Sequence, residues 1–433
     1  MTHEEMKQHY AGLFEQFESS LNGEKALPVH QKRKAAIEYF STAHIPNTKD
    51  EEWKYTNIGP IIAQSFARPA QTADMPAKEV LAAAGVESDL FYTLVFHNGT
   101  LVKQSGGELP AGVTIEPMHD AVKKEYPELS EKLGSLIPHD KDFFSSLNAA
   151  FLQQGALILL KKNSVLEKPV QIINVITADS LMVAPRSLLV AEPGAEAMVF
   201  ETFYGAGEHQ YFTNSVFEFF VAPNATVKYV RVQDESKKAY HVSNIAVSQS
   251  PDSKFFSYNM NFGGSIVRNN ISAEFTGQNA ETHMYGASVV DGNRLIDNHT
   301  AIDHAVPHCE SHQLYKAVLS DDARGVFNGK VMVRKDAQKT NAFQQNNTLL
   351  LSANALIDSK PQLEIFADDV KCSHGATIGR LDETSMFYLK SRGIGEEAAR
   401  KMLVHAFASE TISNLEQEEI AGYIEQLFTS TLD

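Results

Sequence analysis

Cysteine is almost absent from the sequence, and long apolar runs are missing altogether. Cys309 and Cys372 are the two cysteines among 433 residues, whereas secreted proteins more often carry a disulfide framework. The longest apolar runs, such as residues 156–160, are too short to span a bilayer. Residues 1–7 are polar and lack the apolar core of a signal peptide. We therefore expect a protein of a reducing cytoplasm with no membrane partner.

Positive charge is also scarce. The chain has 38 Lys and Arg against 54 Asp and Glu, which gives a net charge of −16 with His neutral. Such a field repels phosphate backbones, so nucleic acid is not expected as a partner. Because 43% of the residues are hydrophobic, the chain can bury a core and is not expected to be disordered.

Three glycine motifs of common enzymes are missing. The sequence contains no G-x-x-x-x-G-K-[ST] phosphate loop, no G-x-G-x-x-G turn and no G-x-S-x-G elbow. This argues against a P-loop ATPase, a simple dehydrogenase and a simple hydrolase. We expect the chain to have no catalytic residue and no ATPase activity of its own.

What is present divides the chain into three regions. Apolar residues recur at helical spacing over 6–21 and 29–43, and shorter helices are expected over 76–85, 120–133 and 142–154. A strand at 91–96 precedes an Asn-Gly hairpin turn at 98–99. From residue 156 onward, β-branched and alternating patterns replace the helical ones. The sequence thus predicts a mostly helical region 1–155, a β core 156–390 and a helical region 391–433.

A weak repeat runs through the β core. Gly194, Asn224, Asp252 and Asn279 are each followed by a small residue and then by a strand, at intervals of 30, 28 and 27 residues. Such spacing is typical of one coil of a β-solenoid, in which each repeat buries its face against its neighbours. A β-sandwich with long hairpins would also show alternating strands, but the repeat favours the solenoid.

The last forty residues contain two apolar helical faces. Met402 and Phe407 lie on the first, and Tyr423 and Phe428 lie on the second. Because the last coil of a solenoid needs covering, part of this surface is expected to close the end of the solenoid. Apolar residues left over from that role would dock a partner, and these four are the candidates.

One polar segment carries the residue types that bind first-row metals. Its members are Asp297, His299, Asp303, His304, His308, Cys309 and His312. Their spacing matches no specific metal motif, and Pro307 implies a turn inside the segment. A solvated solenoid face with histidines at turns explains the pattern without a permanent metal. Transient iron binding at His304, His308 and Cys309 stays open.

A second constellation is the pair Cys372 and His374. On a strand these two side chains point to the same face, and a thiolate beside a neutral imidazole can ligate iron. The alternative is that Cys372 is a small buried hydrophobe in line with Val370. The sequence does not decide between the two readings.

The two cysteines are not expected to pair. Cys309 and Cys372 lie 63 residues apart, which corresponds to about two coils. With strands about 4.8 Å apart, this separation exceeds the reach of a disulfide. Two cysteines also cannot supply the four ligands that an iron–sulfur cluster usually takes. Any cluster held here must borrow ligands from another subunit.

Several runs of the sequence resemble the SufB/SufD family of iron–sulfur cluster assembly proteins. The most specific is 360–379, KPQLEIFADDVKCSHGATIG. The other matching segments are 387–394 (FYLKSRGI), 405–408 (HAFA), 324–329 (RGVFNG), 307–309 (PHC) and 52–56 (EWKYT). The Gly-Ala-Thr at 375–377 favours the SufD branch over the SufB branch, which usually has Glu before Ala-Thr.

This resemblance implies a right-handed parallel β-helix flanked by N-terminal and C-terminal α-helical regions. It implies a non-catalytic scaffold subunit that pairs with a SufB-like paralogue and docks a SufC-like ATPase through its C-terminal helices. A homodimer is possible when the chain is alone. An iron–sulfur cluster or iron would be held transiently and shared with the partner, with Cys372 and His374 facing the paralogue.

Two other classes of protein are compatible with a solenoid. A β-helix enzyme acting on polysaccharide is the main alternative, although such enzymes are commonly secreted. A stand-alone metal-storage or adhesion module is the third. Co-purification of partners from native cells separates the scaffold from both.

Overall fold

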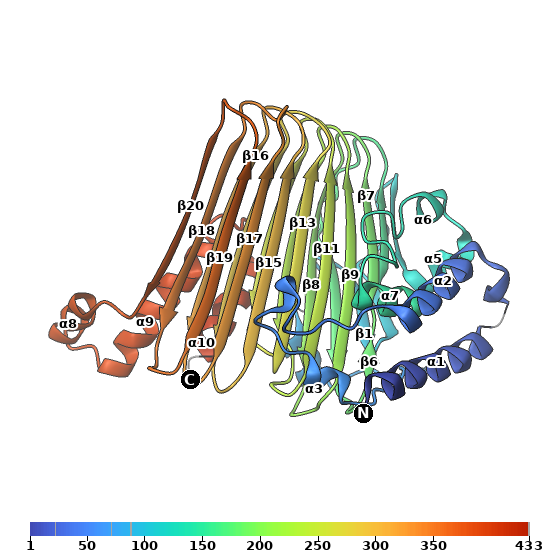
Figure 1. Cartoon of the computed structure of the whole chain (residues 1–433), viewed down its shortest axis with the longest axis horizontal. Coiled ribbons are helices and arrows are strands. Elements are labelled where there is room, and N and C mark those ends of the chain that lie inside the picture. Colours follow the sequence, from blue (N-terminus) through green and yellow to red (C-terminus); the bar gives the residue numbers. More distant parts are fainter. Residues whose placement is uncertain (22, 71, 87–88, 432–433) are drawn as a thin grey trace.

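The computed structural model describes residues 1–21, 23–70, 72–86 and 89–431. Its centre is a β-solenoid of two ten-stranded sheets, whose strands are added alternately as the chain advances (Figure 1). The first sheet has the order β2-β1-β5-β8-β10-β12-β14-β16-β18-β20, and the second has the order β19-β17-β15-β13-β11-β9-β7-β4-β3, with β6 paired to β9. The predicted solenoid is confirmed.

The strands of the first sheet are β1 (Tyr92–His97), β2 (Thr100–Ser105), β5 (Val170–Ile176), β8 (Glu196–Gly205), β10 (Thr226–Asp234), β12 (Lys254–Asn261), β14 (Glu281–Val290), β16 (Glu310–Leu319), β18 (Asn341–Leu350) and β20 (Lys371–Gly379). Those of the second are β3 (Val113–Pro117), β4 (Ala156–Leu160), β6 (Met182–Val183), β7 (Arg186–Ala191), β9 (Phe212–Val221), β11 (Tyr240–Gln249), β13 (Ile266–Phe275), β15 (Leu295–His304), β17 (Arg324–Val333) and β19 (Leu356–Ile365). Strands β1 to β3 belong to these sheets although they precede residue 156.

The repeat seen in the sequence is a column of left-handed turns. Gly194, Asn224, Asp252 and Asn279 have φ of 72°, 59°, 59° and 59°, a conformation that Gly, Asn and Asp adopt most readily. The amide of Asn224 donates to Pro251 O in the next coil at 3.1 Å, and the amides of Gly194 and Asp252 each donate to the next coil at 2.9 Å. Each turn therefore both reverses the chain and fixes the spacing of neighbouring coils.

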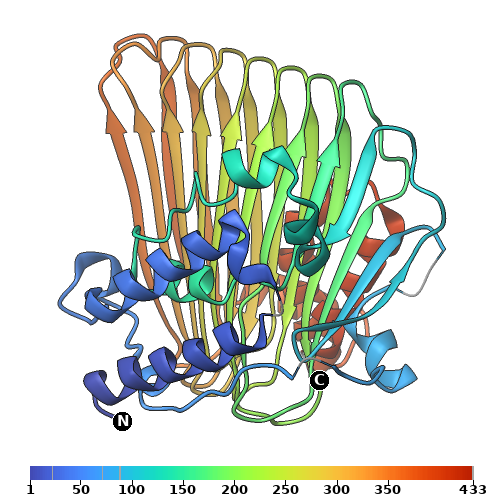
Figure 2. The ribbon, with the colours of Figure 1, turned by 90° about the vertical axis from the view of Figure 1, so that its right-hand side faces the viewer.

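The two ends of the solenoid differ. At the start, the antiparallel strands β2 and β3 occupy the edges of the first and second sheets (Figure 2). At the other end the edges are β19 and β20, and in the described part of the chain no further strand pairs with either. The last coil therefore has no cover of the kind that the first coil has.

The N-terminal helices are α1 (His3–Ser20), η1 (Glu24–Ala26), α2 (Pro28–Thr42), η2 (Glu51–Trp53), α3 (Gly59–Ile62), α4 (Lys78–Ala84), α5 (Met118–Lys124), α6 (Pro127–Glu131) and α7 (Phe143–Ala150). Thr2 and Glu5 form a capping box that starts α1. Instead of one helix over 120–133 there are two, because Glu125 turns into the left-handed region with φ of 51°. The apolar sides of α1, α2 and α7 share a core with β9 and β11.

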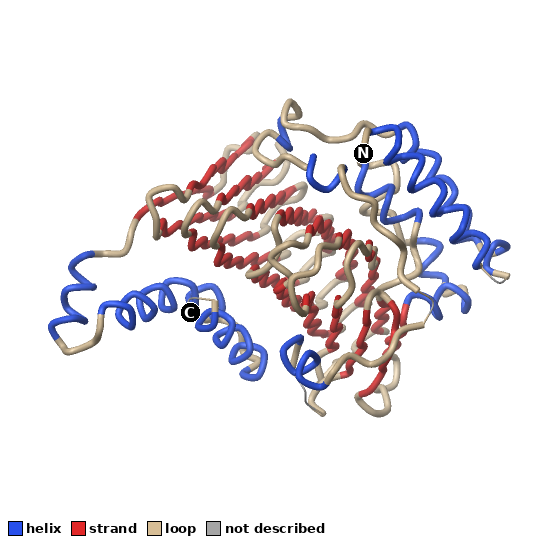
Figure 3. Tube along the Cα trace, turned by 90° about the horizontal axis from the view of Figure 1, so that it is seen from below, coloured by secondary structure: helices blue, strands red, loops and turns tan. Residues whose placement is uncertain are grey.

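The C-terminal helices are α8 (Glu383–Ser391), α9 (Glu396–Ser409), η3 (Glu410–Ile412) and α10 (Glu418–Ser430). They lie on the side of the solenoid opposite α1, α2 and α7 (Figure 3), whereas α4 packs on the same sheet as they do. Helices α9 and α10 pack on the outer face of the first sheet, around β10 to β16. The expectation that they close the end is therefore wrong: they cover a face. No helix in the described ranges is both long and apolar enough to cross a membrane.

Candidate functional site

The open end of the solenoid is the least buried part of the β core. Strand β20 is exposed along nearly its whole length, and β19 is mostly half-buried, whereas the strands behind them are largely buried. Apolar side chains are exposed here, including Ile365 (39%), Phe366 (62%) and Ile378 (54%). An unpaired strand edge beside exposed apolar residues is a surface that readily accepts another strand.

Cys372 and His374 lie on β20 at this end. In the strand register Cys372 is beside Ala342, and His374 is beside Gln344, and both neighbours are buried inside the solenoid. The two side chains therefore share the inward face, as the alternation predicted. Since no coil follows, this inward face is open to solvent.

The two side chains differ in their surroundings. Cys372 is half-buried against the small core that contains Val333 and Ala342, and this burial raises the pKa of its thiol. His374 is exposed, and no residue in the described ranges makes a hydrogen bond to it. It lines a groove of about 500 Å³ together with His312 and Gln344. Cys372 is thus partly packed and also lies at the open end, so both readings of this residue remain open.

Cys309 is a packed residue of the solenoid interior. Its side chain is 0% exposed, and burial raises the pKa of its thiol to about 11. It follows the left-handed turn residue His308, which has φ of 62°. Ala225 and Ala280 occupy the same place after their own turns and are also 0% exposed. Both cysteines are free, as expected.

The polar segment 297–312 does not converge on one point. His304 faces the interior, bonds Ser311 through Nε2 at 2.9 Å, and has its pKa lowered to about 3 by burial. His308 forms a turn, and His312 stacks on His283 on the outer face with ring centroids 5.0 Å apart. Within the described ranges, no group of three or more His, Cys, Asp or Glu side chains is arranged to hold a metal ion.

Asp297 anchors the segment 52–56 to the second sheet. Its carboxylate accepts hydrogen bonds of 2.5 Å from Thr56 Oγ1 and from Arg268 Nη1. Arg268 Nη1 also donates to Glu52 O at 2.8 Å, and its guanidinium lies 4.4 Å from the centre of the Trp53 ring. The early sequence motif therefore has a structural role at this joint.

The four predicted docking residues fall into two groups. Met402 is 50% exposed, and Phe407 is half-buried over the ammonium of Lys316 at 4.4 Å. Tyr423 donates to Ala83 O at 2.9 Å, and Phe428 is 0% exposed against Phe262. The last two hold α10 on the solenoid, so Phe428 in particular is unavailable to a partner here.

Helix α8 presents an apolar surface that the helical patterns alone did not single out. Phe387 is 73% exposed and Tyr388 is 56% exposed, and both precede the left-handed Gly393. In Figure 1, α8 projects from the body beyond α9. The signal in the sequence that could have found this surface is the adjacent aromatic pair. In the structure no residue of α8 is buried, so this pair is left exposed.

The architecture defines a class: a β-solenoid that begins with antiparallel edge strands, ends in an exposed last coil and is flanked by helices on both sides. Comparison with known proteins identifies the family. The family described as "SUF system FeS cluster assembly, SufBD core domain" matches residues 174–407, and "SufBD protein N-terminal region" matches residues 4–172. The chain belongs to the SufB/SufD family of iron–sulfur cluster assembly proteins.

Similar curated proteins agree with this assignment. The chain is 32% identical to the iron–sulfur cluster assembly protein SufD of Escherichia coli over 386 residues, which are 86% of each chain. It is 31% identical to an iron–sulfur cluster assembly SufBD family protein of Synechocystis over 409 residues, 91% of this chain and 89% of the relative. Identity to SufD of Bacillus subtilis is 27% over 383 residues, again 86% of each chain.

Proposed function

We propose that the chain is a non-catalytic scaffold subunit of a SufBCD-type complex, in which it pairs with a SufB-like paralogue through its open end. The observation that carries the proposal is the uncovered edge formed by β19 and β20. A paralogue with the same open edge would extend both sheets by main-chain hydrogen bonds. The exposed Ile378 and Phe366 would supply apolar contact.

The proposal assigns the ATPase to the C-terminal helices. Phe387, Tyr388 and Met402 are the exposed apolar side chains on α8 and α9 that support it, and half-buried Phe407 lies beside them in sequence. Since α9 and α10 pack on the outer face of the first sheet, a conformational change in an ATPase bound there would be transmitted directly to the β core.

At the open end, Cys372 and His374 would contribute ligands to a cluster that the complex builds and passes on. Their shared face, and the access of the imidazole to solvent, support this role. The chain offers one thiol there, so the other ligands would come from the paralogue. The cluster would be held between this chain and the paralogue and then passed on, so it is the substrate of the complex and not a resident cofactor.

The decisive experiment is co-expression of the chain with a SufB-like paralogue and a SufC-like ATPase, followed by affinity purification. We expect one complex containing all three proteins. Ile378→Lys places a charge on the open end and should release the paralogue while leaving the ATPase bound. Met75→Lys, at a residue 46% exposed in the N-terminal region, is the matched control. Retention of the paralogue by Ile378→Lys would remove the open end from the interface, and a homodimer in place of the complex would argue against the pairing.

A further inference from the structure

A second cavity lies away from the open end. It has a volume of about 490 Å³ and is lined by α5, by the β1–β2 hairpin, by the segment after α7 and by β6. This volume falls within the range of about 300–1,000 Å³ that is usual for small-molecule sites. It borders neither Cys372 nor the C-terminal helices, so the proposed scaffold role does not use it.

Arg68 is a positively charged residue in the lining of this cavity. Its guanidinium carbon lies 4.4 Å from the centre of the Phe17 ring and 5.9 Å from that of Phe151. Burial and the nearby charge of Arg33 lower its pKa to about 10. Among the described residues, no acidic side chain forms an ion pair or hydrogen bond with Arg68. A half-buried guanidinium without an anion is costly unless a ligand supplies one.

The one carboxylate in the lining is already engaged. Both terminal nitrogens of Arg33 lie 3.4 Å from Glu24 Oε2, and Arg33 is fully buried. Lys123 Nζ lies 3.8 Å from Glu24 Oε1. Glu24 therefore balances one of these cations, and the cavity keeps an excess of positive charge although the whole chain has a net charge of −16.

The rest of the lining is mixed: part of the wall is apolar, and Thr100, Gln153 and Gln154 are among its polar members. Phe96 and Met182 are buried, Leu101 is half-buried, and Phe151 presents its ring to Arg68. An apolar wall beside a cationic group suits a ligand with a flat or aliphatic body and an anionic head.

From the cavity, the unpaired Arg68 and these walls, we infer that this is a binding site for a small organic anion. The carboxylate or phosphate of the ligand meets the guanidinium of Arg68, and its body lies against Phe151, Met182 and Leu101. The inference stands independently of the proposed scaffold function.

The test uses the full chain and four probes, measured by isothermal titration calorimetry at low salt. Benzoate and phenyl phosphate carry both a ring and an anion and are expected to bind one per chain. Inorganic phosphate lacks the ring, and benzylamine reverses the charge, so both should bind at least tenfold more weakly. Equal affinity for inorganic phosphate, or tighter binding of benzylamine, would overturn the assignment.

Two variants locate the site. Arg68→Met keeps an apolar stem beside Phe17 and should weaken benzoate and phenyl phosphate roughly 10- to 100-fold, as expected for loss of a charged hydrogen bond, while Arg68→Lys restores part of the affinity. Arg380→Met, at an exposed arginine beyond β20, is the control. If Arg68→Met fails to fold, Leu101→Trp fills the cavity from the hairpin and should abolish binding. Unchanged affinity in a folded Arg68→Met or Leu101→Trp protein would sink the inference.

Discussion

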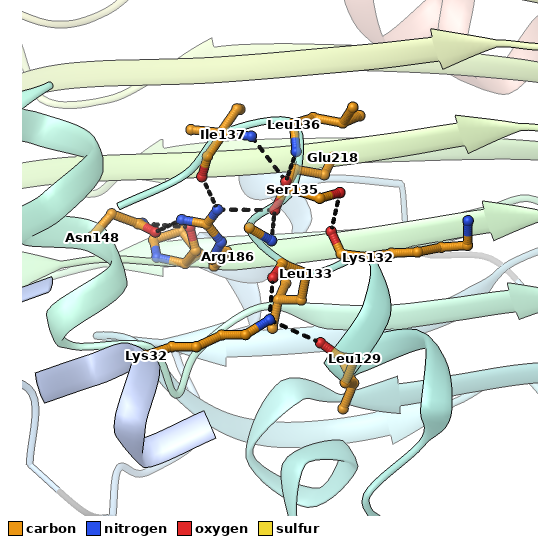
Figure 4. A network of polar contacts seen from close by, with 12 residues as sticks. Lys32, Leu129, Lys132, Leu133, Ser135, Leu136, Ile137, Asn148, Arg186 and Glu218 are labelled. Atoms are coloured by element: carbon orange, nitrogen blue, oxygen red, sulfur yellow. Dashed lines mark hydrogen bonds and ion pairs between the residues drawn. The ribbon is translucent and has the colours of Figure 1, made fainter. Parts of the chain in front are cut away.

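Arg186 and Glu218 form a fully buried ion pair where the N-terminal region meets the solenoid. Arg186 Nη2 lies 2.9 Å from Glu218 Oε2, and the side chains are 1% and 0% exposed. Figure 4 shows the same carboxylate accepting hydrogen bonds from the backbone amides of the segment 134–137, at 2.8–3.0 Å. Neighbouring strands β7 and β9 thus fix the path of the chain between α6 and α7.

Removing this carboxylate should cost more stability than removing any surface ion pair. Glu218→Ala leaves the buried guanidinium of Arg186 without its counter-ion and three backbone amides without their acceptor. We expect a loss of about 3–5 kcal/mol in the free energy of unfolding, measured by chemical denaturation. Lys237→Met breaks a pair with Asp291 whose side chains are 65% and 32% exposed, and should cost at most about 1 kcal/mol. Similar losses for the two variants would show that the buried pair has no special weight.

The joint between Asp297 and Arg268 predicts a pH dependence. Burial alone would raise the pKa of Asp297, but the charges of Arg268 and His299 lower it to about 2 from 3.8. The unfolded chain therefore binds this proton more readily. The stabilisation, about 2 kcal/mol, is present above the unfolded pKa and is lost as the pH falls from about 4 to about 2.

Asp297→Asn isolates this contribution from those of the other carboxylates. Near pH 6 the variant should be less stable than the original chain, because Arg268 is left without its counter-ion. The gap between the two proteins should narrow as the pH falls to about 2. Urea unfolding followed at several pH values is the measurement, and a gap that does not change with pH would contradict the assigned pKa.

The fold could be predicted where local chemistry repeats. Gly194, Asn224, Asp252 and Asn279 were visible as turn residues at regular intervals, and all four adopt the left-handed conformation that such residues tolerate. The location of α9 and α10 was not visible. An apolar face on a helix predicts that the face is buried, but it does not predict which surface buries it. The sequence therefore could not distinguish packing on the end of the solenoid from packing on its outer face.

The site could be predicted in part for a similar reason. Alternation placed Cys372 and His374 on one face, which the register confirms. The residue types at 297–312 suggested one cluster, but successive strand residues point to opposite faces, and His308 sits in a turn between strands. The tie between Thr56 and Asp297 joins residues 241 apart, and no local pattern carries such a contact.

The two thiols should differ in reactivity. Cys309 is fully buried with its pKa raised to about 11, whereas Cys372 is half-buried at the open end. Iodoacetamide near pH 8 should therefore alkylate Cys372 first and leave Cys309 unmodified in the folded chain. Mass spectrometry of tryptic peptides gives the two rates. Equal rates in the native state would show that the interior at Cys309 is not closed.

The exposed residues of α8 and α9 should carry the affinity for the ATPase. Phe387→Ala and Met402→Ala each remove an exposed apolar side chain, worth about 1.5–3 kcal/mol if buried by a partner. Each should weaken binding of the purified ATPase by roughly tenfold or more in surface plasmon resonance. Leu356→Ala removes an apolar side chain that is 50% exposed on β19 and is the control. This variant should weaken binding of the paralogue and leave binding of the ATPase unchanged. The reverse result would mean that the ATPase binds at the open end and the paralogue binds at the C-terminal helices.

The last prediction concerns the cargo. His374 is exposed and makes no hydrogen bond within the described ranges, so His374→Ala should leave the fold and the assembly of the complex intact while lowering its iron and sulfide content. Cys372→Ala should have as large an effect if the thiol is a ligand, and a smaller one if it only packs against Ala342. Cys309→Ala should have the least effect, because its side chain is 0% exposed. The measurement is iron and sulfide per complex after anaerobic purification, with size-exclusion chromatography as the check on assembly. Unchanged iron content in an assembled His374→Ala complex would remove this imidazole from the cluster site.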